Sequence, residues 1–351
     1  MLAVKSKPRK PEAEPSTPSN LSQERPPLKR RRVEEAASAP SSSSRPNRTP
    51  AEPREKVVWV KDRPRDYGYW QATPGDTKGK PRALIIFSGR SRSGDLSHQL
   101  ARLGWLVCSL DTQSPVPTDI LDDAIWDDVS SNIRDGYFDA LWLGTPCGTF
   151  SPLREKPPGP RPLRSKEHIE GLPQDQLTEG EIKQLKTANV LVKRTYTAAA
   201  YQNRAKKPWG VENPKHPDDK PQLWQMPLMQ ALAKLRNVEA VDFDQCRTGL
   251  GTTKPTRMLV KRIKLDSLRG LRCNHVMKQH TRPDGSTYTA AHESTVQRWI
   301  EGPTGRQRAS KAQGEYSVTL CKILAKAFHE ARQEALGTES PEKEEAPTGP
   351  R

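Results

Sequence analysis

Short apolar runs alternate with helix-like segments through the middle of the chain. Residues 82–88 and 105–110 have the length and composition of strands that are covered on both faces. Between them, residues 95–103 carry leucines at spacings of four and three, which places these leucines on one face of a helix. Residues 82–111 are therefore predicted to form a strand–helix–strand unit, the repeating unit of a doubly wound sheet.

The alternation continues toward the C-terminal end. Further strands are expected over residues 138–143, 208–214, 238–243 and 256–262, and further helices over 120–133, 185–205, 223–235 and 316–334. This order predicts an α/β fold with a doubly wound, mostly parallel, Rossmann-like sheet. Residues 152–180 are rich in proline, arginine and lysine and are expected to form a mobile basic loop.

The two ends of the chain differ in composition from its middle. Residues 1–56 contain no aromatic residue, hold 10 of the 33 prolines and carry 13 Lys and Arg against 7 Asp and Glu. Such a segment buries too little apolar surface to offset its ordering entropy, so it is predicted to be a disordered tail, as is 336–351. Between the tails we expect a main domain over 57–264, a small inserted subdomain over 265–304 and a closing segment over 305–335.

The charge of the chain points to an anionic partner. Its formal net charge is +16, of which +10 remains when residues 1–56 are set aside. A basic folded surface favours nucleic acid, DNA in the first place, although a charge balance that only favours solubility is the alternative. The tail also contains a compact cationic cluster of the kind that nuclear-import receptors bind, or else a generic basic patch. The cluster consists of Lys29, Arg30, Arg31 and Arg32.

Cysteine usage and hydropathy indicate the compartment. Five dispersed cysteines, an odd number, do not suggest a disulfide framework and favour a reducing compartment. No apolar run approaches the roughly 18–20 residues that span a bilayer, and the N-terminus lacks the apolar core of a signal peptide. We therefore expect a soluble intracellular protein without membrane association, nuclear if the tail cluster is an import signal and cytoplasmic otherwise.

Residues with chemical potential follow four of the predicted strands. In an open parallel sheet, ligands bind beyond the carboxyl ends of the strands. The segments that reach this edge are 88–94, Asp111, 144–151 and 212–214. Their functional side chains are therefore expected to converge.

The segment Gly144-Thr-Pro-Cys-Gly-Thr-Phe-Ser151, which follows a buried strand, resembles the Pro-Cys catalytic loop of the cytosine-C5 DNA methyltransferases. Further motifs of that family are matched in order between residues 82 and 330. They are the cofactor loop (Phe87-Ser-Gly89 with Gly94), a strand that ends in a ribose-binding acid (104–111), the Glu-Asn motif (Val211-Glu-Asn-Pro214), the Gln-x-Arg region (Asp244-Gln-Cys-Arg247 with Lys254-Pro-Thr256) and the final motif (312–318). The chain is similar to a divergent member of this family, of the kind found in mobile elements or viruses.

The resemblance implies methylation of cytosine C5 in DNA. Carbon 5 is a poor nucleophile, so the ring is first activated by covalent attack at carbon 6, a role that the resemblance gives to Cys147. Glu212 would hold the pyrimidine at N3 and at its amino group, and Arg247 would position the base or balance the carboxylate. A target base inside a duplex would have to be flipped out.

The resemblance also implies a class I methyltransferase domain that binds S-adenosylmethionine. The residues expected to bind this cofactor are Phe87, Gly89, Gly94, Asp111, Asp128 and Pro146. The sequence departs from the family in its cofactor loop, where residues 90–93, two of them arginines, separate the two glycines. Only about 40 residues, 265–304, occupy the place of a DNA-reading domain, so sequence specificity is expected to be small or supplied by another molecule.

Each candidate residue also has a structural interpretation. Cys147 could be a buried cysteine, and Glu212 an ordinary loop acid. Asp111 lies where turns favour aspartate, and Asp128 could belong to a solvated helix face. Residues 154–164 could contact phosphates or form a solvated linker. For the whole chain, the alternatives to an active DNA methyltransferase are an inactive methylase-like fold that binds nucleic acid or another partner and, less favoured, an RNA methyltransferase.

One group of residues has the ligand types that zinc prefers. It consists of Cys273, His275, His280 and His292. Their spacing matches no established zinc pattern, and isolated histidines on a basic surface are common. Because a small subdomain poor in apolar residues would be stabilised by a metal, the sequence leaves a zinc site open without assigning one.

Overall fold

The computed structural model describes residues 56–155, 160–281, 285–293, 299–302, 305–308 and 314–338. The tail expected over residues 1–56 lies outside the described residues, apart from its last residue, and so does the cationic cluster at 29–32. Of the second expected tail, 336–351, only the first three residues are described, and they belong to a helix.

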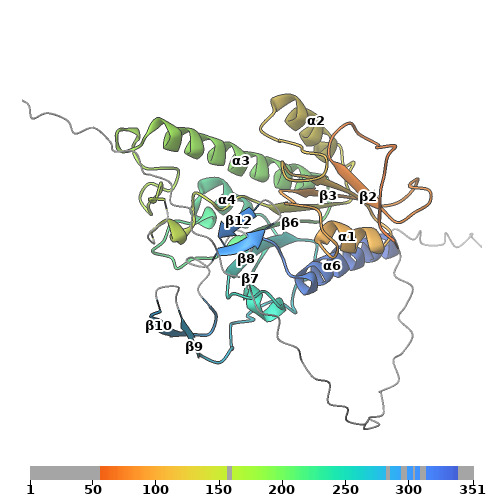
Figure 1. Cartoon of the computed structure of the whole chain (residues 1–351). Helices are drawn as coiled ribbons and strands as arrows, with labels where there is room; N and C mark the ends of the chain where they lie inside the picture. Colours follow the sequence, from red (N-terminus) through yellow and green to blue (C-terminus); the bar gives the residue numbers. More distant parts are fainter. Residues whose placement is uncertain are drawn as a thin grey trace, which may run out of the picture. The chain divides into compact units, whose positions relative to one another are not determined.

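An eight-stranded sheet lies at the centre of the described structure, in the order β1-β2-β4-β3-β5-β6-β8-β7 (Figure 1). Its strands are β1 (Val58–Trp59), β2 (Tyr69–Ala72), β3 (Arg82–Ile86), β4 (Leu106–Leu110), β5 (Ala140–Gly144), β6 (Trp209–Pro214), β7 (Glu239–Asp244) and β8 (Pro255–Lys261). Strands β4, β3, β5 and β6 are parallel, whereas β2 and β8 run against their neighbours. The expected mixed α/β fold with a mostly parallel sheet is confirmed.

Helices cover both faces of this sheet (Figure 1). Helices α2 (Asp123–Arg134), α3 (Glu179–Arg204) and α4 (Pro227–Ala233) lie on one face, and α1 (Leu96–Arg102) and α6 (Val318–Thr338) lie on the other. Four short 3-10 helices connect these elements: η1 (Pro152–Glu155), η2 (Gln174–Gln176), η3 (Leu223–Gln225) and η4 (Gln245–Thr248). Two separate hairpins, β9 (Lys278–Thr281) with β10 (Thr287–Ala290) and β11 (Trp299–Gly302) with β12 (Gly305–Arg308), follow the sheet in sequence.

The central strands are apolar on both sides because each side has its own core. Leu84 and Leu141 belong to the apolar cluster that includes residues of α2, α3 and α4. The next residues along each strand, Ile85 and Trp142, belong to a second cluster with residues of α1 and α6. Since successive strand residues point to opposite faces, a continuous apolar run is what a doubly covered strand requires.

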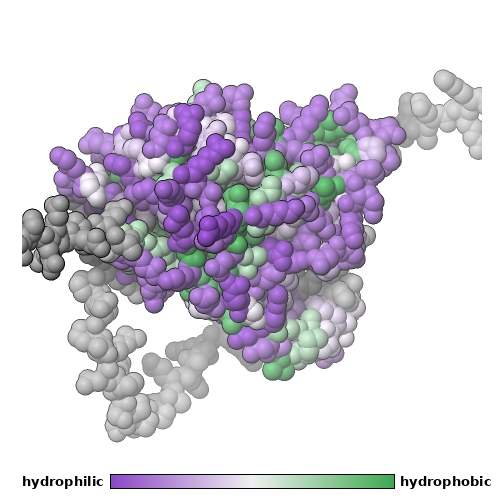
Figure 2. Space-filling model, turned by 180° about the vertical axis from the view of Figure 1, so that it is seen from behind, coloured by the Kyte–Doolittle hydropathy of each residue, from purple (hydrophilic) through white to green (hydrophobic). Residues whose placement is uncertain are grey.

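Most expected elements are present, with ends that differ by a few residues. The sequence did not predict β1, β2 or the two hairpins, and it predicted a loop where α3 begins at Glu179. The surface seen from behind is mostly hydrophilic, with apolar residues near its centre, toward its upper right and at its lower edge (Figure 2). Across the described residues, every helix is either too short or too polar to traverse a lipid bilayer.

The strand order fixes where a ligand site is expected. The chain passes from β3 through α1 to β4 on one side, and then through α2 to β5 on the other side of β3. This reversal is a topological switch point, and ligands of open α/β sheets bind there, outside the carboxyl ends of the strands. The segments after β3 and β5 begin with Phe87 and Thr145.

Candidate active site

Cys147 lies in the loop that follows β5, next to the switch point. Its side chain is half-buried, and the Phe150 amide donates to its carbonyl oxygen at 2.9 Å, which closes a turn. Burial raises the pKa of the Cys147 thiol, whereas the positive charge of Lys254 lowers it and the negative charge of Glu212 raises it. The thiol therefore lies within the electrostatic reach of both charged groups.

Glu212 lies on the neighbouring strand β6, paired in register with Gly144 of β5. It is buried, with 5% of its surface exposed, and three donors surround its carboxylate. Gln245 donates to Oε1 at 3.2 Å, the Tyr316 hydroxyl donates to Oε2 at 2.9 Å, and Lys254 Nζ lies 3.6 Å from Oε1. A buried carboxylate requires such compensation, so these groups hold Glu212 in a fixed position beside the Cys147 loop.

Tyr316 and Lys254 come from segments that are distant in sequence. Tyr316 precedes α6, and its hydroxyl accepts a hydrogen bond from Trp142 Nε1 at 3.3 Å while it donates to Glu212. Burial and then the charge of Glu212 raise the pKa of Tyr316 well above its ordinary value, so the hydroxyl remains a donor. Lys254 precedes β8 with a φ of 35° and lies 5.6 Å from the centre of the Tyr316 ring.

Asn213, the second residue of the Glu-Asn motif, has a structural contact. It is fully buried, and its Nδ2 donates to the carbonyl oxygen of Thr145 at 2.7 Å. The Thr145 side chain in turn contacts Thr195 of α3, with 3.1 Å between the hydroxyl oxygens. Asn213 therefore connects the end of β6 to the first residue of the Cys147 loop.

Arg164 is buried beneath the Cys147 loop, with 2% of its surface exposed. Its guanidinium donates to the Thr149 hydroxyl at 3.0 Å, to Asn189 at 2.8 Å and to the Ile169 carbonyl at 2.6 Å. The guanidinium carbon also lies 4.1 Å from the centre of the Phe150 ring. Residues 154–164 were expected either to contact phosphates or to form a solvated linker. Both expectations are wrong for Arg164, because its side chain is buried and donates to polar groups of the protein.

Arg247 is not among the residues that contact Glu212. It lies exposed on η4, and its Nη1 donates to the carbonyl oxygen of Arg272 at 2.8 Å. Two residues before it, Gln245 contacts Glu212 and also donates to the Thr256 hydroxyl at 3.0 Å. Of the Gln-x-Arg motif, the structure thus brings the glutamine and not the arginine to the carboxylate.

The loop expected to bind the cofactor follows β3, and hydrogen bonds tie it to the end of β4. Phe87 has a left-handed backbone with φ of 63°, and the amide of Gly89 donates to Asp111 Oδ2 at 2.9 Å. The amide of Gln113 donates to Asp111 Oδ1 at 2.8 Å. Gly94 is packed so closely against Val318 of α6 that a Cβ at this position would lie 3.0 Å from a Val318 methyl group.

The charge of Arg92 in this loop is compensated. Its Nε lies 3.2 Å from a carboxylate oxygen of Glu315, and its Nη2 donates to the Tyr316 carbonyl at 2.5 Å. Arg92 therefore joins the loop after β3 to the segment that supplies Tyr316 to Glu212. The segment around Tyr316, far away in sequence, thus contacts this loop.

The two remaining cofactor candidates are exposed. Asp128 lies on α2, where its carboxylate accepts from Asn132 on the next turn at 2.8 Å. This contact fits the solvated helix face that was the alternative for Asp128. Pro146 precedes Cys147 and is accessible at the start of the loop.

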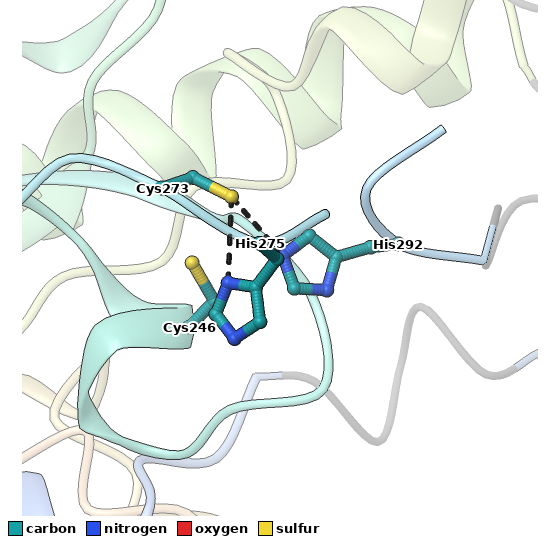
Figure 3. A group of neighbouring side chains, drawn as sticks. All are labelled: Cys246, Cys273, His275 and His292. Carbon is teal, nitrogen blue, oxygen red and sulfur yellow. Dashed lines mark hydrogen bonds between the residues drawn. The ribbon is translucent and has the colours of Figure 1, made fainter. Parts of the chain in front are cut away.

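A second group of chemically active side chains lies at η4 and the segment that follows β8 (Figure 3). The structure gathers Cys246, Cys273, His275 and His292, with their ligand atoms all within 4.8 Å of one another. Three of the four zinc candidates from the sequence are present. His280 Nε2 instead donates to the Ala290 carbonyl oxygen, 3.1 Å away, and its ring stacks on Tyr288 within the hairpin.

Sequence comparisons add no family assignment. No protein-family model matches the chain, and no curated protein matches it at a significant level. The interpretation of the site therefore rests on its residues and their geometry.

Proposed function

We propose that this chain is an S-adenosylmethionine-dependent methyltransferase that modifies cytosine C5 in DNA through a covalent adduct on Cys147. The observation that carries the proposal is the placement of Cys147 and Glu212 at the carboxyl ends of the adjacent parallel strands β5 and β6. Lys254 is close enough to influence both groups. A nucleophile and a base-holding carboxylate in this arrangement suit attack on a pyrimidine ring.

The residues of the chain account for activation of the ring. The thiolate of Cys147 attacks carbon 6, a bond forms between Sγ and carbon 6, and the electron pair of the C5–C6 double bond moves to carbon 5. Lys254 favours the thiolate form that this attack requires. Glu212 accepts from the exocyclic amino group and, when protonated, donates to N3, which stabilises the negative charge that develops on the ring. Tyr316 and Gln245 hold its two oxygens in place.

The loop after β3 and the end of β4 fit the cofactor. The Asp111 carboxylate accepts one backbone amide on each oxygen, so it retains acceptor capacity for the hydroxyls of a ribose. Glu315 compensates the charge of Arg92, which would otherwise oppose a cationic sulfonium. When bound, S-adenosylmethionine supplies an electrophilic methyl group.

The first test is trapping on DNA that contains 5-fluorocytosine, in the presence of S-adenosylmethionine. Fluorine at carbon 5 blocks the final elimination, so a working enzyme stays covalently attached to the DNA. We expect a denaturation-resistant adduct from the wild-type chain and none from Cys147→Ala. Cys321→Ala is the matched control, since Cys321 is a buried thiol of α6 within the apolar core between the sheet and helices α1 and α6.

The same assay separates the alternatives. An adduct on RNA but not on single-stranded or double-stranded DNA would replace the proposed substrate by RNA. If a folded wild-type chain forms no adduct on either polymer and binds nucleic acid equally well after Cys147→Ala, the chain is an inactive methylase-like binding module.

A further inference from the structure

We propose that Cys246, Cys273, His275 and His292 bind one structural Zn²⁺ ion. The inference does not rest on the proposed methyltransferase function, because it concerns a different group of side chains. Two thiolates and two imidazoles are a set of four protein ligands typical of tetrahedral structural zinc.

The distances among these side chains fit a tetrahedron. With zinc–sulfur and zinc–nitrogen bonds of about 2.3 and 2.0 Å, neighbouring ligand atoms should lie about 3.3–3.8 Å apart. The Cys273 sulfur lies 3.6 Å from His275 Nδ1 and 3.3 Å from His292 Nε2, and no pair in the group is separated by more than 4.8 Å (Figure 3). Small side-chain rotations would close the remaining distances.

The surroundings of the group orient its ligands. The amide of Cys273 donates to Asp244 Oδ2 at 2.7 Å, and Arg247 donates to the carbonyl of the preceding residue. The His292 ring also lies beside the backbone of Gly251, in the turn between η4 and β8. Because these contacts come from both sides of the group, the two chain segments are already held at ligand-forming distance.

The segment that supplies three of the ligands has little other means of stability. None of the described residues between 271 and 293 is buried, and the hairpin of β9 and β10 pairs only with itself. A two-stranded hairpin is marginal in water on its own. Cys246, in contrast, is buried on η4, directly after Gln245. The ion would attach the hairpin segment to η4, beside the glutamine that contacts Glu212.

Zinc binding would also change the protonation of the two thiols, Cys246 and Cys273. Both cysteines release their protons to solvent when the metal binds, and the divalent charge compensates the two thiolates. All four positions around the ion would be filled by side chains. The ion therefore has a structural role and leaves no open position for a substrate.

The test is the metal content of the full-length protein, purified without chelator and measured by elemental mass spectrometry. We expect one zinc per chain, and a content below about one tenth in Cys273→Ala. His275→Ala is the second variant, because His275 is exposed and its replacement leaves the core intact. His280→Ala, in the same hairpin but bonded to the Ala290 carbonyl, should keep its zinc.

Cobalt provides an independent measurement. Replacement of zinc by Co²⁺ should give the intense visible absorption of tetrahedral cobalt with thiolate ligands, and the absorption should disappear in Cys246→Ser. The proposal is overturned if the wild-type chain retains no stoichiometric zinc after dialysis, if His280→Ala loses as much zinc as Cys273→Ala, or if non-reducing mass spectrometry finds Cys246 and Cys273 joined in a disulfide.

Discussion

Lys254 acts on two residues of the candidate site, Glu212 and Cys147. Its ammonium lies 3.6 Å from Glu212, and its charge lowers the pKa of Cys147 against the stronger effect of burial. Burial leaves the Cys147 thiol mostly protonated at neutral pH. The thiolate fraction therefore depends on how far the charge of Lys254 lowers the pKa that burial has raised. The rate of any reaction of Cys147 should therefore rise as the pH is raised toward the thiol pKa.

Replacing Lys254 by methionine should make Cys147 less reactive. Without the positive charge the pKa of Cys147 rises further, so the pH profile of its alkylation by iodoacetamide should move to higher pH. Adduct formation on 5-fluorocytosine DNA should fall by on the order of 10- to 100-fold. Alkylation is measured by mass spectrometry of the Cys147 peptide. Lys261→Met is the control, since Lys261 donates to the Arg236 carbonyl at the far end of β8; an equal shift in both variants would contradict the role of Lys254.

The sequence identified the site residues that belong to short motifs and missed those that reach it from far away. The structure brings Cys147 and Glu212 together because two adjacent parallel strands end there. Tyr316 reaches Glu212 from 104 positions along the chain, and only the fold places it there. The final motif contained Tyr316, but nothing in the sequence assigned the side chain a contact.

The same limitation applies to the zinc candidates. His280 lies close to the other candidates in sequence, but its strand pairing with Tyr288 directs it into the hairpin. Cys246 lies 27 positions before Cys273, and the turn after β7 brings it into the group. Proximity along the chain was thus a poor guide to proximity in space.

At the scale of elements, the segment after Cys147 is held by one buried arginine. Burial lowers the pKa of Arg164 to about 10, and its guanidinium satisfies polar groups of three different segments. Composition alone predicted a mobile loop here, because sequence does not distinguish an arginine that pairs with protein from one that is solvated. Arg161, in the same segment, is exposed and pairs with Glu181 at 2.7 Å.

Arg164→Met should lower the free energy of unfolding by about 1–3 kcal/mol, because it leaves Asn189, Thr149 and a backbone carbonyl without their donor. The loop of Cys147 should also lose order, so adduct formation should fall. Denaturant unfolding measures the first effect. Arg161→Met removes an exposed ion pair with Glu181 and an exposed hydrogen bond to the Gln176 carbonyl, and it should change stability by less than about 1 kcal/mol. Equal effects of the two substitutions would show that burial of Arg164 has no special importance.

The backbone of β6 at Gly210 lies directly against a side chain of the paired strand β5. The ring of Trp142 lies against this glycine, so a Cβ there would overlap the ring. Trp142 also donates to Tyr316, so the contact extends to the group that holds Glu212. The glycine is therefore a packing requirement of the site.

Gly210→Ala should destabilise the protein by about 1–3 kcal/mol through overpacking, and it should reduce adduct formation because Trp142 has to move. Thermal and denaturant unfolding provide the measurement. Gly180→Ala is the matched control, since Gly180 is exposed in the first turn of α3 with no atom near its Cβ position. That substitution should raise stability by up to about 1 kcal/mol. A neutral Gly210→Ala would contradict the close packing.

The elements that the sequence predicted well are those with two apolar faces. Strands β3, β4 and β5 consist mostly of apolar residues, and each contributes to the apolar cores on both faces of the sheet. Strands β1 and β2 extend over only two and four positions, which is too short for a periodic signal. Tyr69 and Trp70 favour a strand locally, and tertiary pairing with β4 completes it.

At the scale of the whole molecule, the basic charge is spread over the chain. Residues 1–56 contribute +6 and the remainder +10 to the formal charge. If the chain acts on a flipped cytosine at Cys147, the phosphates around that base lie against the part of the chain that forms the site. Contacts in that part should then provide most of the electrostatic affinity for DNA.

The salt dependence of DNA binding distinguishes the two sources of charge. For B-DNA, log K falls with log salt concentration by about 0.9 for each phosphate contact. Replacing Lys29, Arg30, Arg31 and Arg32 together by alanine should change this slope by less than about 1, while nuclear accumulation in a eukaryotic cell should be lost. A slope reduced by about 3–4 would mean that the cluster itself contacts phosphates. In that case the tail, and not the surface around Cys147, would provide much of the affinity, and the inactive binding module would become the better explanation of the charge.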